Sequence, residues 1–165
     1  MVSTDDVRRL REMTGAGIMD CKRALDETKG DFEKAVEVLR QKGLAQAAKR
    51  AERATEQGLV EAYIHTGGRV GALVELLCET DFVARTDEFK ELAHDIALQV
   101  TATAPAAISE DEDGVREMEP GELVLLKQPF IRDQSKTIED LIREAIAKTG
   151  ENIKIRKVAR FEVGR

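Results

Sequence analysis

Side chains that could perform covalent chemistry or hold a metal are few and dispersed along the chain. His65 and His94 are the only two histidines, and the pattern around them places them in different elements, without a Cys or His at metal-ligand spacing. We therefore interpret both as surface or partly buried imidazoles. Cys21 and Cys78 lack the spacing of a redox pair and are typical of buried thiols in a reducing cytosol.

No segment predicts a nucleotide or cofactor site. A phosphate-binding loop needs a glycine-rich turn between a strand and a helix, followed by a Lys-Ser or Lys-Thr pair, and the chain has none. Gly15 and Gly17 fall between two predicted helices, which indicates a corner. The acidic side chains lie on helix faces and in a loop, where they usually serve solvation. We expect no cofactor, no metal and no catalytic residue, and hence no enzyme acting on a small molecule.

One short run, residues 79–85, differs from its surroundings. It separates a buried-looking strand from a helix, and two interpretations fit. In the first and commoner case, Thr80 or Asp81 caps a short helical turn. Phe82 and Val83 then pack into the core. In the second case, Phe82 projects from a rigid turn, with Asp81 beside it, and serves as an anchor for a binding partner.

The composition argues against a general nucleic-acid binder and against a membrane protein. The 165 residues carry a formal net charge of -6, whereas phosphate contacts need clustered Lys and Arg. The net negative charge is confined to residues 57–121, which contain 14 acidic and four basic side chains. Aromatic side chains for stacking on bases are scarce. No apolar stretch is long enough to span a membrane, and charged residues interrupt any secretory pattern at the start.

Two segments must position these residues, and the first is helical. Residues 1–45 predict three short helices, in which apolar side chains recur at helical spacing. Gly15 and Gly30 separate the helices, and Gly43 closes the unit. Residues 46–57 are rich in Ala, Lys, Arg and Glu but have a weak apolar face, so we predict a helical linker there.

Residues 58–165 predict an α+β core. Two strand-like runs, 59–65 and 70–77, flank a Thr-Gly-Gly turn, which is a hairpin signal. Residues 153–163 alternate as a last strand. We expect this strand to pair with the hairpin in a three-stranded antiparallel sheet, covered by two helices.

Two amphipathic helices complete the predicted core. One begins after Thr86, and the other begins at Thr137, where Asp140 completes a capping pattern. Between the helices, residues 109–122 hold seven acidic side chains, two glycines and a proline. This composition predicts a solvated loop.

Two long and specific motifs lie in these segments. They are residues 10–25, which read LREMTGAGIMDCKRAL, and residues 80–85, which read TDFVAR. They resemble the N-terminal signature and the second signature of the bacterial elongation factor Ts family. Residues 128–130 and 160–164, which read QPF and RFEVG, are similar to the C-terminal part of that family, although these short matches are weak alone.

The resemblance implies an architecture, a partner and an activity. Members of this family have a three-helix module similar to ubiquitin-associated domains, a helical linker and an α+β core. The resemblance implies that the chain is a cytoplasmic guanine nucleotide exchange factor that binds elongation factor Tu, both GDP-bound and nucleotide-free. It implies release of GDP so that GTP can bind, without covalent chemistry and without direct contact to nucleic acid or membrane.

The resemblance also assigns roles to residues. The family's Thr-Asp-Phe-Val motif inserts near the magnesium site of elongation factor Tu, which assigns displacement of the partner's magnesium ion to Thr80, Asp81, Phe82 and Val83. The three-helix module of the family docks on the nucleotide-binding domain of elongation factor Tu. The corresponding partner-binding residues, with Arg85 added, are Met13, Thr14, Gly15, Ala16, Gly17, Ile18, Met19, Asp20 and Lys22.

The chain departs from the longer members of the family. Those carry a duplicated core and a projecting helical hairpin, whereas this chain has one TDFVAR unit and only the acidic loop where the projection would be. Contacts made through the projection are therefore not carried over. Short members resemble dimers in which two cores replace the duplication, and an apolar sheet face would support a homodimer here. Some relatives have a cysteine near the position of Ala159, so a disulfide-linked dimer is not available to this chain.

Two other functions fit parts of the sequence. The three-helix unit could hold ubiquitin-like partners or nascent chains, but this function leaves residues 80–85 without a role. A hydrolase could use Asp81 and Glu79, but no nucleophile or base partner is evident. A pull-down from bacterial lysate separates exchange from the first alternative, because elongation factor Tu should dominate the captured protein if the exchange interpretation holds.

Overall fold

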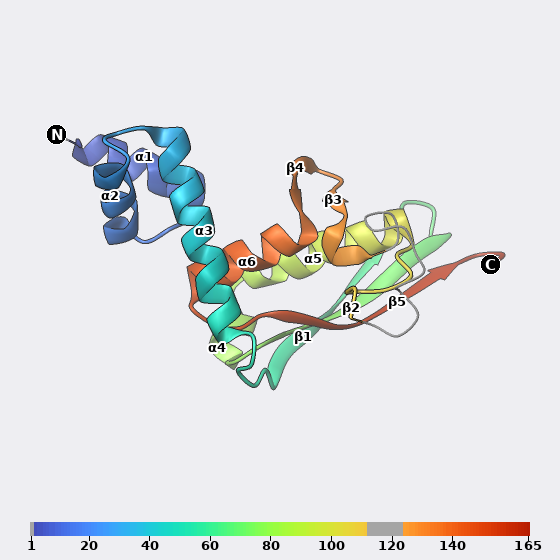
Figure 1. Cartoon of the computed structure of the whole chain (residues 1–165). Helices are drawn as coiled ribbons and strands as arrows, with labels where there is room; N and C mark the ends of the chain where they lie inside the picture. Colours follow the sequence, from blue (N-terminus) through green and yellow to red (C-terminus); the bar gives the residue numbers. More distant parts are fainter. Residues whose placement is uncertain (1, 112–123) are drawn as a thin grey trace. The chain divides into compact units, whose positions relative to one another are not determined.

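A computed structural model describes residues 2–111 and 124–165 (Figure 1). Contacts within the chain group the residues into two units. Unit 1 contains Met1–Glu52 and Arg143–Glu151, and unit 2 contains Arg53–Ile142 and Asn152–Arg165. Residues Arg143–Glu151 therefore belong to unit 1 although they come late in the sequence. The predicted division into 1–45, 46–57 and 58–165 did not include this return.

Unit 1 is built on three helices, as the apolar spacing predicted. They are α1 (Thr4–Thr14), α2 (Ile18–Glu27) and α3 (Phe32–Arg50). Ser3 and Asp6 form a capping box that satisfies the first backbone N–H groups of α1. The buried core of this unit consists of Val7, Leu10, Cys21, Ala24, Leu25, Ala35 and Leu39.

The third helix extends further than predicted. We expected Gly43 to end it and a separate linker helix to span residues 46–57, but α3 continues through Gly43 to Arg50. The residues after Gly43 are good helix formers, and they offset the roughly 1 kcal/mol that a glycine costs inside a helix. Beyond Arg50 the prediction of a helix is wrong, because a turn follows and Gln57 already belongs to the first strand.

Unit 2 contains the predicted three-stranded antiparallel sheet. Its strands are β1 (Gln57–Ile64), β2 (Val70–Cys78) and β5 (Lys154–Glu162), in the spatial order β1-β2-β5. The turn between β1 and β2 needs glycine, since Gly67 and Gly68 have φ angles of 94° and 68°. The α+β class and the pairing of the last strand with the hairpin are therefore confirmed.

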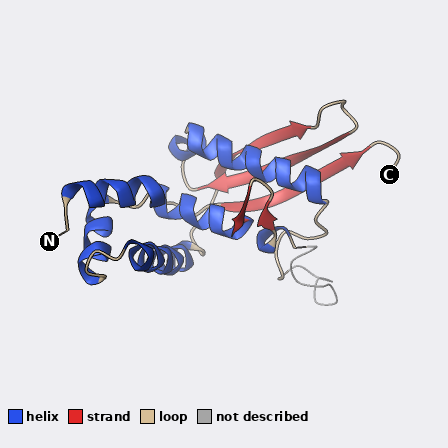
Figure 2. Ribbon diagram, turned by 90° about the horizontal axis from the view of Figure 1, so that it is seen from above, coloured by secondary structure: helices blue, strands red, loops and turns tan. Residues whose placement is uncertain are grey.

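Helix α5 (Asp87–Thr103) covers one face of this sheet (Figure 2). Side chains of β2 alternate between the two faces, and those on the α5 side are buried. The apolar side chains of the amphipathic helix predicted after Thr86 are buried on this side. The core of unit 2 includes Ala72, Val74, Leu76, Phe89, Leu92, Ala93, Ile96, Ala97 and Val100.

Helix α6 (Ile138–Thr149) begins as predicted at Thr137, whose hydroxyl accepts a hydrogen bond from the backbone N–H of Asp140 at 3.1 Å. The sequence did not predict the short sheet before it, β3 (Pro129–Phe130) paired with β4 (Asp133–Thr137), or the 3-10 turn Leu125–Lys127.

The buried Gln99 of α5 fastens this small sheet to the core. Its side-chain amide donates to the carbonyl of Pro129 at 3.1 Å and accepts from the backbone N–H of Ile131 at 3.0 Å. Most of the predicted acidic loop, residues 112–122, lies outside the described residues. In the part of the chain that the structure describes, no helix is long and apolar enough to cross a membrane.

Candidate protein-interaction site

The TDFV run forms a single turn of helix, α4 (Asp81–Ala84), between β2 and α5. Thr80 caps the turn, because its hydroxyl accepts a hydrogen bond from the backbone N–H of Val83 at 3.4 Å. The buried thiol of Cys78 donates to the carbonyl of Thr80 at 3.1 Å. Ala84 is buried. The start of the turn is therefore attached to the last residue of β2.

Thr86 attaches the other end of the turn. Its hydroxyl donates to the carbonyl of Val83 at 2.8 Å and accepts from the backbone N–H of Phe89 at 3.3 Å. One hydroxyl thus bonds both to α4 and to the first turn of α5. The α4 turn is held at both ends by contacts within unit 2.

Phe82 points out of this fixed turn. Its side chain is 79% exposed, more than any other large hydrophobic side chain in the described residues. The interpretation in which Phe82 packs into the core is therefore wrong, although the Thr80 cap that it assumed is present. Val83 is half-buried. A capped turn that buries Ala84 leaves the second helical position, which is Phe82, on the outside.

Charged groups lie directly beside Phe82. The carboxylate of Asp81 and the guanidinium of Arg85 form an ion pair of 2.9 Å across one helical turn. Both side chains are substantially exposed, so the pair contributes little to stability. Its consequence is local: an anionic and a cationic group belong to the same short turn as the exposed ring of Phe82.

The second predicted surface, residues 13–22, lies on unit 1 and is also largely apolar. Met13, Ile18 and Met19 are exposed by 58%, 53% and 61%. Lys22 is exposed, whereas Asp20 is half-buried and forms an ion pair of 2.7 Å with Lys42 of α3. The large side chains at the end of α1 and the start of α2 therefore face solvent.

Local contacts fix the corner between α1 and α2. The hydroxyl of Thr14 donates to the carbonyl of Leu10 at 2.8 Å and accepts from the backbone N–H of Ala16 at 3.3 Å. Gly15 ends α1 with a φ of 67°, a conformation that favours glycine. Gly17 precedes the first residue of α2 in an extended conformation. The corner thus presents the two methionines and Ile18 from a defined backbone.

A third apolar surface lies on the outer face of the unit 2 sheet, away from α5. Val60 and Ile64 of β1 are both 65% exposed, Leu73 of β2 is 42% exposed, and Phe161 of β5 is 69% exposed. The sequence contains a signal for this surface. In a strand with one solvated face, the outward positions are usually polar, whereas the outward positions of β1 are apolar.

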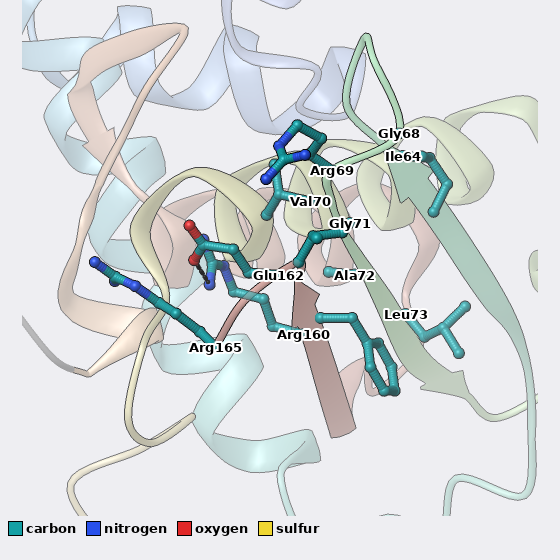
Figure 3. A pocket seen from close by; sticks show the side chains of 12 residues that line it. Ile64, Gly68, Arg69, Val70, Gly71, Ala72, Leu73, Arg160, Glu162 and Arg165 are labelled. Atoms are coloured by element: carbon teal, nitrogen blue, oxygen red, sulfur yellow. Dashed lines mark hydrogen bonds and ion pairs between the residues drawn. The ribbon is translucent and has the colours of Figure 1, made fainter.

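This face is hollowed where Gly71 lies between two large side chains. Gly71 pairs with Ile64 on one side and with Phe161 on the other, so the three share one row. A Cβ atom at Gly71 would lie 2.8 Å from the carbonyl oxygen of Tyr63, too close for any other residue. Figure 3 shows side chains that line the resulting hollow, among them Ile64 and Leu73. Its volume is about 440 Å³.

Both histidines contact side chains of β1. His94 contacts Glu61, with Nδ1 and Oε1 3.2 Å apart, and His65 contacts the hydroxyl of Tyr63 at 3.1 Å. Among residues 2–111 and 124–165, no group of three or more His, Cys, Asp or Glu side chains is arranged to hold a metal ion.

A small α+β protein with large hydrophobic side chains exposed at three places is typical of the class of proteins that work by contacting other proteins. Comparison with known sequences identifies the particular family. The sequence model for elongation factor TS matches residues 22–119, a range that includes the α4 turn. The chain belongs to the elongation factor Ts family. It is therefore a translation elongation factor of protein biosynthesis.

Curated relatives match nearly the whole chain. Elongation factor Ts of Carboxydothermus hydrogenoformans is 48% identical over 195 aligned positions, which cover 99% of this chain and 90% of the relative. The proteins of the same name from Moorella thermoacetica and Thermotoga neapolitana are 46% and 47% identical, and 96% and 98% of their lengths are covered. Because the chain has 165 residues, at least 30 aligned positions of the first relative have no counterpart here.

Proposed function

We propose that the chain is a guanine nucleotide exchange factor for elongation factor Tu. It binds the GDP-bound form, displaces the magnesium ion and promotes release of GDP, so that GTP can bind. The observation that carries this proposal is Phe82, which is 79% exposed on a turn fixed at both ends. Membership of the elongation factor Ts family supports the choice of partner.

The physical argument concerns the charge on the nucleotide. A magnesium ion bridges the phosphates and compensates their negative charge, so its loss weakens the hold on GDP. Thr80, Asp81, Phe82 and Val83 displace the elements of the partner that hold this ion. The rigid turn matters because a wedge that could fold back would relax instead of distorting the partner.

One aromatic side chain does not supply enough free energy for this distortion. Burial of a Phe side chain contributes about 1.5–3 kcal/mol. Unit 1 therefore acts as the docking module, similar to a ubiquitin-associated domain, and holds the wedge in place. The corner of α1 and α2 provides the contact, through Met13, Thr14, Gly15, Ala16, Gly17, Ile18, Met19, Asp20 and Lys22, while Arg85 contributes beside the wedge.

A homodimer is part of the same proposal, with the outer face of the sheet as the interface. Val60, Ile64, Leu73 and Phe161 are exposed there, and burying them against a second copy removes apolar surface from water. Position 159, which pairs with Leu73 in the middle of this face, is an alanine. Because it is not a cysteine, no disulfide can form there, and the proposed contact is non-covalent. Two cores then stand in for the duplicated core of longer family members.

The coupling between nucleotide and partner is reciprocal. A factor that weakens the binding of GDP must itself be bound less tightly when GDP is present. It therefore accelerates exchange without choosing its direction, and it makes or breaks no covalent bond. The activity belongs in the cytoplasm, where elongation factor Tu works, and involves neither nucleic acid nor membrane directly.

A stopped-flow experiment tests the proposed function. Elongation factor Tu carrying a fluorescent GDP analogue is mixed with excess unlabelled GDP, with and without the chain. We expect release to accelerate with the concentration of the chain and then to saturate. In an equilibrium titration, added GDP should weaken binding of the chain to elongation factor Tu. Release that stays at its intrinsic rate at every concentration would overturn the proposal.

A further inference from the structure

Three residues form a closed ring of contacts directly before the α4 turn. The carboxylate of Glu79 accepts a hydrogen bond from the backbone N–H of Asn152 at 2.6 Å. The side-chain amide of Asn152 donates to the carbonyl of Arg53 at 2.8 Å. The guanidinium of Arg53 closes the ring, 3.5 Å from the same oxygen of Glu79.

The contacts of the ring differ in strength. Asn152 is only 3% exposed, and its short bond to a carboxylate is of the charge-assisted kind. The Glu79 side chain is 24% exposed and that of Arg53 is 53% exposed, and their contact is long. The bond between Glu79 and Asn152 therefore dominates, and the exposed Arg53 side chain adds little.

The ring joins all three strands of the sheet at one end. Arg53 precedes β1, Glu79 follows β2 and Asn152 precedes β5. Because the strands are antiparallel, these ends meet: Gln57 pairs with Cys78, and Leu77 pairs with Lys154. Arg53 and Asn152 are also the two residues at which the chain enters unit 2 from unit 1.

We propose that Glu79 is a positioning residue for the exchange wedge. It fixes the backbone from which the Thr80 cap begins, and so sets the direction of Phe82. Thr86 fixes the far end of the turn, so that both ends are held by side-chain hydrogen bonds. This inference rests on the proposed exchange function and extends it to the residues that hold the wedge without contacting the partner.

Four variants, compared with the wild-type chain and with Phe82→Ala, test the proposal. Glu79→Ala removes the acceptor, whereas Glu79→Gln retains a side-chain oxygen for the N–H of Asn152. Asn152→Ala removes the side-chain bond to Arg53 but keeps the backbone N–H that Glu79 accepts. Asp95→Ala is the matched control, because Asp95 is also a partly buried acid of unit 2 with one arginine partner, Arg132 at 2.9 Å.

Two quantities are measured on folded protein. One is the maximal rate of GDP release together with the concentration giving half that rate, and the other is amide hydrogen exchange of residues 80–86. For Glu79→Ala we expect a maximal rate reduced by roughly tenfold, since displacement of a positioned group by about 1 Å can cost up to about 100-fold. The half-saturating concentration should stay unchanged, and amide exchange at residues 80–86 should rise.

The other variants separate positioning from a general loss of stability. Glu79→Gln should restore most of the maximal rate, Asn152→Ala should give an intermediate rate, and Asp95→Ala should match the wild type. Should Glu79→Ala not fold, Glu79→Gln and Asn152→Ala carry the test. An unchanged maximal rate in folded Glu79→Ala, while Phe82→Ala slows release, overturns the positioning role but leaves the exchange function standing.

If the wild-type chain does not accelerate release, the exchange function fails instead. The amide exchange data then decide the role of the ring in the turn. If the amides of residues 80–86 are equally protected from hydrogen exchange in Glu79→Ala and in the wild type, Glu79 does not position the turn.

Discussion

Replacement of Phe82 by Ala removes the most exposed large hydrophobic side chain of the described residues without disturbing a buried contact. Because 79% of the Phe82 surface is already in water, the core loses little. Ala also favours the helical conformation of the α4 turn more than Phe does. We therefore expect the free energy of unfolding of Phe82→Ala to stay within about 0.5 kcal/mol of the wild type.

The effect on nucleotide release should be much larger. Full burial of a Phe side chain contributes about 1.5–3 kcal/mol. Since 79% of Phe82 is exposed in the free chain, about 1–2.5 kcal/mol of this remains to be gained against the partner. At about 1.4 kcal/mol for each factor of ten in rate, losing this contribution slows GDP release by roughly fivefold to sixtyfold.

The assay is stopped-flow release of a fluorescent GDP analogue from elongation factor Tu, at saturating concentrations of each variant. Ile131→Ala is the control, because Ile131 is a large hydrophobic side chain of the same unit that is 42% exposed on a different segment. It should release GDP as fast as the wild type. A Phe82→Ala protein that is folded and equally fast refutes the wedge, whatever the control does.

Further variants test the other surfaces and the scaffold. Met19→Asp should raise the dissociation constant for elongation factor Tu by about tenfold in calorimetry, because it places a charge on the apolar corner of unit 1; an unchanged constant would exclude this corner from the interface. Phe161→Glu should shift sedimentation of the chain from dimer towards monomer. Thr86→Ala should lower the free energy of unfolding by about 1 kcal/mol in a urea titration, since the cap of α5 is lost. The thiols of Cys21 and Cys78 should resist Ellman's reagent at pH 8 until the chain unfolds, because both are buried, and burial is the main cause that raises the pKa of Cys21 and reduces its thiolate fraction.

The sequence predicted those elements that have a local chemical cause. Thr86 and Thr137 each precede a helical apolar pattern, and each accepts the expected backbone hydrogen bond. The Thr-Gly-Gly turn could be assigned because only glycine takes the positive φ angles observed at Gly67 and Gly68 without strain. Caps and turns depend on neighbouring residues alone, so one sequence is enough to find them.

Elements that depend on distant partners were not found. β4 reads DQSKT, without the alternation of a half-buried strand, and its sheet is held by Gln99, about 30 residues earlier in the chain. Gly43 was predicted to end a helix because glycine destabilises a helix interior, and this cost can be seen in the sequence. The contacts that support the continuation of α3 to Arg50 cannot be seen there. The ring of Glu79 joins residues 53, 79 and 152, and no local pattern connects them.

Phe82 shows most clearly why the exposure of a candidate site residue could not be predicted from the sequence. Successive residues of a helix are rotated by about 100°, so one turn cannot bury all of its hydrophobic side chains. The cap at Thr80 determines where the helical turn begins, but it does not determine which residue of the turn faces the core. The fold buries the small Ala84 and leaves Phe82 79% exposed, which forgoes about 1–2.5 kcal/mol of burial. Such a choice is not explained by stability, and it is expected where a side chain is kept for a partner.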